Sequence, residues 1–192
     1  MIFQINKRTA QIGACALVLT PMWALPAQAA PDGSKVVINE VYARGGSKNQ
    51  PYKNKFIELY NPTDEAISLD GMSLQYFSAA GTGGTNTTDL TGHEIAAGGY
   101  FLVQGGSNGS VGAELPEPDL TSSLSPSGTN GAIALVDGTS TLTGVEAGDL
   151  AGDPRFVDFV GFGSSDKYEM AAANYQGGTS CISLGGCEQF GG

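Results

Sequence analysis

The sequence predicts an all-β protein built as an antiparallel β-sandwich. Apolar and polar residues alternate through residues 56–76, which is the period of strands with one buried and one solvated face. Turn signals such as Asp70-Gly71 interrupt this alternation, and a turn after about every eight to ten residues is typical of a sandwich. The chain also has 29 glycines among its 192 residues, which suits short strands joined by long loops.

Residues 1–29 are predicted to be a signal peptide. Lys7 and Arg8 precede a short apolar run at residues 12–20, and Ala27-Gln28-Ala29 has the small-x-small pattern of a cleavage site. Cys15 lies inside the apolar run, whereas a lipoprotein signal places its cysteine at the end of that run. We therefore expect a secreted protein that is cleaved after Ala29 and has no transmembrane segment.

The exported chain is strongly acidic. It keeps seven basic and 19 acidic residues, a net charge of −12. Its length fits one domain with its own core, which we place at residues 30–167, followed by a poorly defined tail at residues 168–192. A chain of this charge disfavours nucleic acid as a partner, because DNA binding depends on many cationic contacts.

Strand signals follow one another along the predicted domain. They lie at residues 36–42, 56–60, 67–69, 72–76, 100–103, 132–136 and 156–162. Residues 79–94 are polar and rich in glycine, and are predicted to be a connector too flexible to hold a strand for long. Residues 138–154 are predicted to be a long hairpin loop, and residues 179–184 a final edge strand.

The strand segments also resemble a known family. FIELYNPTDEAISLDGMSLQY at residues 56–76, preceded by VVINEVY at residues 36–42, is similar to the opening of the lamin-tail domain. The likeness continues through IAAGGYFLV, NGAIALVDG and RFVDFVGFG, and ends at residue 163. The resemblance implies an immunoglobulin-like antiparallel β-sandwich. It also implies a non-catalytic module of the kind that bacteria often attach to secreted nucleases, phosphatases or cell-surface proteins.

Most of the basic residues of the exported chain are gathered in one early stretch. The candidate binding residues of this stretch are Arg44, Lys48, Tyr52, Lys53 and Lys55. One hypothesis is a patch for an anionic partner such as nucleic acid or polysaccharide. The other, which we favour, is a solvated loop between the first two strands.

Three carboxylates lie in the middle of predicted strands. Glu40, Glu58 and Asp158 each stand between apolar neighbours, and adjoining strands would bring them together. A calcium or catalytic site needs converging oxygens of this kind. We instead expect structural carboxylates bonded to backbone or hydroxyl donors, and a metal-dependent hydrolase is the weaker alternative.

Several other sites are disfavoured by the residues available. His93, the only histidine, stands in a polar loop with no nucleophile-elbow motif in the chain, so a Ser-His-Asp triad is not expected. A zinc site lacks ligands for the same reason. We expect no cofactor, although a calcium loop between residues 138 and 154 stays conceivable without the Asp-x-Asp-x-Asp-Gly pattern.

Two cysteines remain after export. Cys181 and Cys187 would meet an oxidising compartment, which favours a disulfide between them, within one chain or between two. The sequence as a whole predicts an exported, non-catalytic module that binds a protein or a cell-surface component. The alternative is an accessory domain of a secreted nuclease or phosphatase that helps attachment to nucleic acid or membrane.

Overall fold

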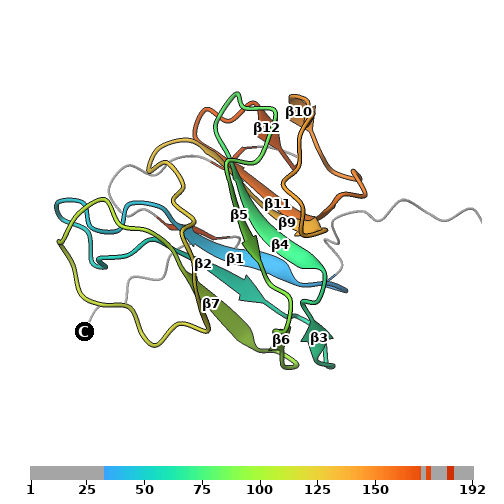
Figure 1. Ribbon diagram of the computed structural model, residues 1–192, viewed down its shortest axis with the longest axis horizontal. Coiled ribbons are helices and arrows are strands. Elements are labelled where there is room, and N and C mark those ends of the chain that lie inside the picture. Colours follow the sequence, from blue (N-terminus) through green and yellow to red (C-terminus); the bar gives the residue numbers. More distant parts are fainter. Residues whose placement is uncertain (1–32, 170–171, 174–180, 184–192) are drawn as a thin grey trace, which may run out of the picture.

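Two β-sheets packed face to face make up the molecule in the computed structural model, which describes residues 33–169, 172–173 and 181–183 (Figure 1). The five-stranded sheet has the order β13-β1-β2-β7-β8, and the four-stranded sheet has the order β11-β9-β4-β5. No described residue belongs to a helix, and so none of them forms a helix able to cross a membrane. The predicted all-β antiparallel sandwich is confirmed.

The five-stranded sheet is antiparallel apart from one edge. Its strands are β1 (Val37–Tyr42), β2 (Phe56–Tyr60), β7 (Tyr100–Gln104), β8 (Leu120–Thr121) and β13 (Cys181–Ser183). Only β8 runs parallel to its neighbour, β7. The edge strand predicted at residues 179–184 is present as β13, which pairs with β1.

The four-stranded sheet is antiparallel throughout. It consists of β4 (Met72–Phe77), β5 (Asn86–Asp89), β9 (Gly131–Asp137) and β11 (Phe156–Phe162). Two short pairs lie outside the main sheets: β3 (Ile67–Ser68) with β6 (Glu94–Ile95), and β10 (Gly148–Asp149) with β12 (Lys167–Tyr168).

The main core lies between the two sheets. Alternate residues of the strands point into it, as the period of two requires, except in β1, where a bulge between Ile38 and Glu40 shifts the alternation by one residue. The buried members from the central strands are Ile38, Val41, Ile57, Leu59, Leu74, Phe101, Val103, Ile133 and Leu135.

A second apolar cluster covers the other face of the four-stranded sheet. Phe77, Val136, Phe156 and Phe159 are at most 3% exposed there, and Val145 of the loop at residues 138–155 is buried against them. The sequence predicted one wet face for each sheet, and for the four-stranded sheet that prediction is wrong. Its long loop folds back and excludes water.

The turn at residues 61–65 is built by one buried amide. The Asn61 side chain accepts a bond from the Thr63 backbone N–H (3.0 Å) and donates to the carbonyl of Glu65 (2.8 Å). It also donates to the carbonyl of Ile95 (3.0 Å), on the segment that pairs with β3. The predicted turn chemistry is therefore present, and it also joins two loops.

The predicted connectors contain more structure than expected. Residues 79–94 include β5, which pairs with β4 along four residues, and the loop at residues 138–154 includes β10. A strand of Asn, Thr and Asp has no apolar alternation to reveal it, so pairing with β4 decides its structure. The signal segment and Cys187 lie outside the described residues, and the disulfide stays a prediction.

Candidate interaction surface

Two loops come together at one end of the sandwich, where the first connects β1 to β2 and the second follows β7 (Figure 1). We call residues 45–55 and 105–114 the paired loops. Their backbones bond one another directly: the Lys53 N–H to the Ala113 carbonyl (2.8 Å), the Asn108 N–H to the Gly45 carbonyl (2.9 Å), and the Lys55 N–H to the Gly106 carbonyl (2.8 Å). Each loop is thus the structural support of the other.

Glycine makes this close approach possible. Gly46 has a φ of +80°, and a Cβ atom placed on it would lie 2.5 Å from the backbone nitrogen of Gly109. Gly112 has a φ of +105°, and its Cβ would lie 2.7 Å from the backbone nitrogen of Lys53. Larger residues at either position would force the loops apart.

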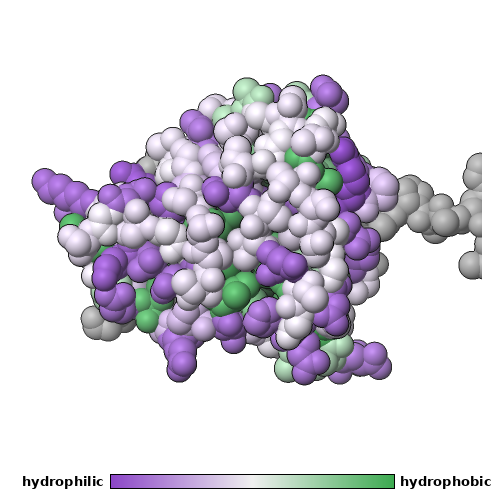
Figure 2. Space-filling model, in the orientation of Figure 1, coloured by the Kyte–Doolittle hydropathy of each residue, from purple (hydrophilic) through white to green (hydrophobic). Residues whose placement is uncertain are grey.

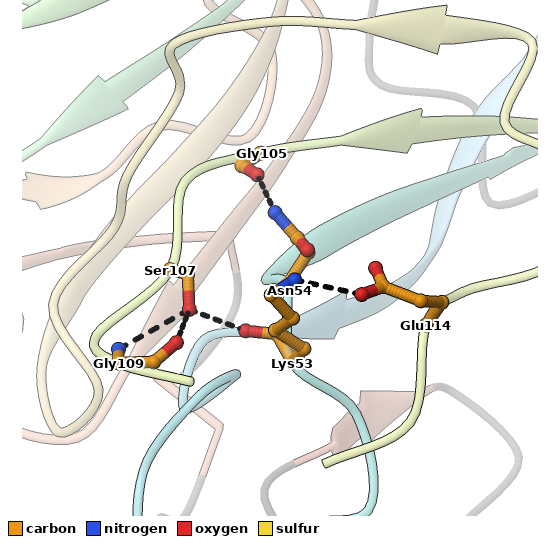
Figure 3. Close-up of polar contacts among 6 residues, drawn as sticks. All are labelled: Lys53, Asn54, Gly105, Ser107, Gly109 and Glu114. Carbon is orange, nitrogen blue, oxygen red and sulfur yellow. Dashed lines mark hydrogen bonds and ion pairs between the residues drawn. The ribbon is translucent and has the colours of Figure 1, made fainter. Parts of the chain in front are cut away.

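Side chains add further bonds between the paired loops (Figure 3). The Asn54 amide donates to the Gly105 carbonyl (3.0 Å), and the Ser107 hydroxyl oxygen lies 2.5 Å from the Lys53 carbonyl oxygen. Lys53 Nζ forms an ion pair with Glu114 Oε1 at 2.7 Å. These contacts hold a surface whose outer residues remain exposed. The exposed residues include Lys48 and residues 107–114, and among the latter Val111 is 46% exposed.

The structure separates the five candidate binding residues. Lys48 is exposed, Lys53 is paired with Glu114, and Arg44 is half-buried and has a partner of its own. Tyr52 is half-buried in an aromatic group, with its ring 5.9 Å from that of Tyr42 and 6.1 Å from that of Phe56 between ring centroids. The basic stretch is therefore an ordered loop. The side chains of Arg44 and Tyr52 lie partly against the protein.

Lys55 differs most from the exposed cation that its place in the cluster predicted. Its side chain is 4% exposed, and Nζ donates to the Pro126 carbonyl (2.7 Å) and to the Ser125 hydroxyl (3.1 Å). Burial lowers the pKa of the Lys55 ammonium. The residue ties β2 to a loop some 70 residues further along the chain, and it offers no charge to a partner.

Two of the three candidate carboxylates, Glu40 and Glu58, are adjacent, and the third, Asp158, lies on the other sheet. Glu40 lies directly opposite Glu58, next to a bulge that puts Asn39 beside them. The Asn39 amide donates to Glu58 Oε1 (2.7 Å), while Asp158 Oδ2 accepts a bond from the Ile38 N–H (2.5 Å) on the neighbouring sheet. Asp158 thus bonds a backbone donor, and Glu58 bonds a side-chain amide.

Burial and like charges act on these carboxylates. Desolvation, with the Glu58 charge in second place, raises the pKa of Glu40 to about 7. Burial also raises the pKa of Asp158. Glu169, near Asp158 and Asp149, has its pKa raised to about 7, chiefly by desolvation. Among the residues that the structure describes, no three His, Cys, Asp or Glu side chains are grouped so as to hold a metal ion.

His93 lies against the protein instead of in the open loop that the sequence predicted. It is half-buried, and its ring packs on Phe101 with the two ring centroids 5.1 Å apart. Its backbone carbonyl accepts a bond from the Leu69 N–H (2.9 Å). These contacts give the histidine a packing role.

One surface feature was missed by the sequence analysis. Tyr60 and Tyr100 lie opposite each other on β2 and β7, with ring centroids 4.7 Å apart and planes tilted by 30°. Tyr100 is 58% exposed. The sequence did contain a signal for this exposure, because Tyr100 begins a strand in which outward-facing and buried residues alternate.

The two packed antiparallel sheets and the loops that join them define an immunoglobulin-like β-sandwich domain. The chain belongs to the lamin tail domain family, whose model matches residues 29–149. No curated protein matches it.

One solved structure is similar at a distance. It is the crystal structure of a DUF4876 family protein from Bacteroides thetaiotaomicron, with 13% sequence identity and a TM-score of 0.36. The match covers 54% of this chain and 42% of that one, so this chain spans less than half of that protein. A likeness at this level carries no argument about function.

Proposed function

We propose that this protein is an exported, non-catalytic binding module whose contact surface is formed by the paired loops. The observation that carries this proposal is the backbone bonding between residues 45–55 and 105–114. Loops held on a rigid scaffold are the usual binding surfaces of sandwich domains. Because the paired loops are ordered before a partner binds, no binding free energy is spent on ordering them.

The proposed partner is a protein or another component of a cell surface. Export is proposed from the signal segment at residues 1–29. The exposed residues of the paired loops are mixed in character and include the cation Lys48, the carboxylate Glu114 and the apolar Val111. The view of the molecule in Figure 2 likewise shows apolar residues only in small separate areas. A polar interface of moderate size fits such a surface better than an obligate apolar one.

The alternative function, an accessory domain of a secreted nuclease or phosphatase, is supported by the basic stretch but weakened by its geometry. Lys53 is neutralised by Glu114, and Lys55 is buried. Fewer cations are then available for the phosphate contacts that give DNA binding its affinity.

Binding to cells tests the proposal. The secreted chain, with its mature N-terminus established by mass spectrometry, is labelled and incubated with the envelope fraction of its producing cell. Gly46→Ala should reduce retention about tenfold or more, because the added Cβ meets the Gly109 backbone. Gly71→Ala is the control, since Gly71 has a similar φ of +75° but open space around it. Equal losses in the two variants, or none in either, would refute the paired-loop surface.

A second assay addresses the alternative. Fluorescence anisotropy and gels with labelled DNA are run with and without Ca²⁺ and Mg²⁺. We expect neither cleavage nor salt-sensitive binding. Cleavage would overturn the non-catalytic assignment, and binding that Lys48→Glu and Lys53→Glu abolish would establish the accessory role instead. Dependence of any binding on Ca²⁺ would reveal a calcium requirement.

A further inference from the structure

The outer face of the five-stranded sheet carries an ordered set of polar and aromatic side chains. The register of β1, β2 and β7 arranges them in rows across the strands. One row contains Tyr60 and Tyr100, and the next contains Glu40, Glu58 and Leu102. Residues directly opposite in adjacent strands share a face, so the tyrosine pair and the glutamate pair are neighbours on one surface.

One member of the tyrosine pair, Tyr100, is exposed to solvent, and the other, Tyr60, is half-buried. Tyr100 is 58% exposed, which makes it the more exposed of the two large apolar side chains, Tyr100 and Val111, that lie at the surface of the described part of the chain. Its ring lies 4.7 Å from the Tyr60 ring between centroids, with a 30° tilt. The two rings together form an aromatic platform whose π-faces attract cations.

The three central strands contribute carboxyl groups and no cation to this face. The strands VINEVY, FIELY and YFLVQ contain two ionisable acids, Glu40 and Glu58, and no lysine or arginine. The Asn39 amide bonds Glu58 Oε1 at 2.7 Å, which fixes the orientation of that carboxylate. Glu58 and Tyr60 are two residues apart on one strand, a spacing of about 7 Å, which a single long cationic side chain can span.

We propose that the outer face of β1, β2 and β7 is a second binding surface, and that it takes a peptide segment bearing lysine or arginine. The carboxylate of Glu58 accepts hydrogen bonds from the cation, and the Tyr60–Tyr100 platform packs against its alkyl chain and charge. The net charge of −12 on the exported chain supports the same partner, because it draws cationic segments from a distance. This surface is separate from the paired loops: Tyr60 ends β2 and Tyr100 begins β7, whereas the paired loops adjoin the start of β2 and the end of β7.

Binding of a labelled octalysine peptide tests the proposal, with octaglutamate and chitohexaose as comparison probes. The full secreted chain should bind octalysine and neither of the other two. Tyr100→Ala and Glu58→Gln should each weaken octalysine binding about fivefold, while Tyr100→Phe should retain it because the ring remains. Glu117→Gln is the matched control for charge, since Glu117 is an exposed acid on a loop outside these strands.

Each contrary result overturns the proposal in a different way. An equal loss in Glu58→Gln and Glu117→Gln would reduce the effect to the general attraction of an acidic protein. Binding of chitohexaose that requires Tyr100, without binding of octalysine, would make the platform a saccharide surface. No binding of octalysine by a folded chain would also refute it. If Tyr100→Ala fails to fold, Glu58→Gln and Tyr100→Phe still decide the matter.

Discussion

The two sheets of this sandwich share one core but differ in what lies on their other faces. Phe77, Phe156 and Phe159 of the four-stranded sheet are covered by the loop at residues 138–155. The corresponding face of the five-stranded sheet presents Glu58, Tyr60 and Tyr100 at its surface, none of them fully buried. The chain therefore buries one sheet on both faces and leaves the other with a surface that a partner can reach.

Two polar side chains of β4 help to hold the covering loop in place. Gln75 of β4 is fully buried, and its amide donates to the Ser140 carbonyl (3.0 Å) while its carbonyl accepts from the Leu142 N–H (2.9 Å). Ser73 donates to the Gly138 carbonyl at 2.6 Å. Polar residues of β4, backbone bonds of the loop to residues 82 and 84 and the packing of Val145 thus together cover one face of the four-stranded sheet.

The largest predicted effect contrasts aromatic residues on the two outer faces. Phe77→Ala should lower the free energy of unfolding by about 3–5 kcal/mol, because it opens a cavity among Phe156 and Phe159. Tyr100→Ala, which removes an exposed ring, should cost at most about 1 kcal/mol. Urea denaturation followed by circular dichroism measures both. Similar losses would show that the two faces are equally important for stability.

A second contrast uses the same residue type on each sheet. Gln75→Ala removes the bonds that anchor the covering loop, and leaves the Leu142 N–H without its acceptor. We expect a loss of about 2–3 kcal/mol, with faster hydrogen exchange at residues 138–145. Gln104→Ala, at the half-buried end of β7, should change the stability by no more than about 0.5 kcal/mol. If exchange in the loop stayed unchanged in Gln75→Ala, the amide would not be its anchor.

Asp158 joins the two sheets, and its removal should have an intermediate effect. The carboxylate of this β11 residue accepts the Ile38 N–H of β1 at 2.5 Å. Asp158→Ala should cost about 1–3 kcal/mol by leaving a backbone donor unsatisfied. Asp158→Asn should retain most of the stability because its amide oxygen can still accept that bond. Equal losses for both variants would mean that the negative charge, and not the hydrogen bond, is what matters; thermal and urea denaturation distinguish the cases.

The sequence predicted the strands with apolar alternation, but not the asymmetry between the sheets. The apolar run at residues 132–136 predicted a strand, whereas the burial of both its faces was not predicted. What covers its outer face could not be predicted, because the loop at residues 138–155 has few apolar residues and is held by residues distant in the sequence, among them Gln75, Ser73 and Thr82. β5 was missed for a related reason, since its sequence NTTD has no apolar residue.

The candidate site was predicted less completely than the fold. The pairing of Glu40 with Glu58 followed from adjacent strands, and the sequence analysis raised it as a possibility. The burial of Lys55 could not be foreseen, because its acceptors, Pro126 and Ser125, lie far along the chain. Contacts over such distances depend on tertiary structure, whereas residue type alone predicts exposure for a lysine.

The smallest predicted effect concerns the ionisation of the open face. The pKa of Glu40 is about 7 in the folded protein, against an ordinary value of 4.5. Between these two pH values the folded chain holds a proton that the unfolded chain has released, so stability falls as the pH rises through this window. Glu40 is only half-buried, and solvent screening should limit the effect to about 1 kcal/mol.

Replacement of the carboxyl by an amide tests this effect. Glu40→Gln cannot release a proton, so it should be about 1 kcal/mol more stable than the natural chain at pH 8 and nearly equal to it at pH 4. Glu169 has a raised pKa of the same kind and will keep part of the pH dependence, which the double variant with Glu169→Gln should remove. Glu117→Gln, on an exposed loop, is the control. If Glu40→Gln and Glu117→Gln had the same pH profile of stability, the burial of the Glu40 carboxylate beside the Glu58 charge would carry no energetic cost, and the two outer faces would differ in packing alone.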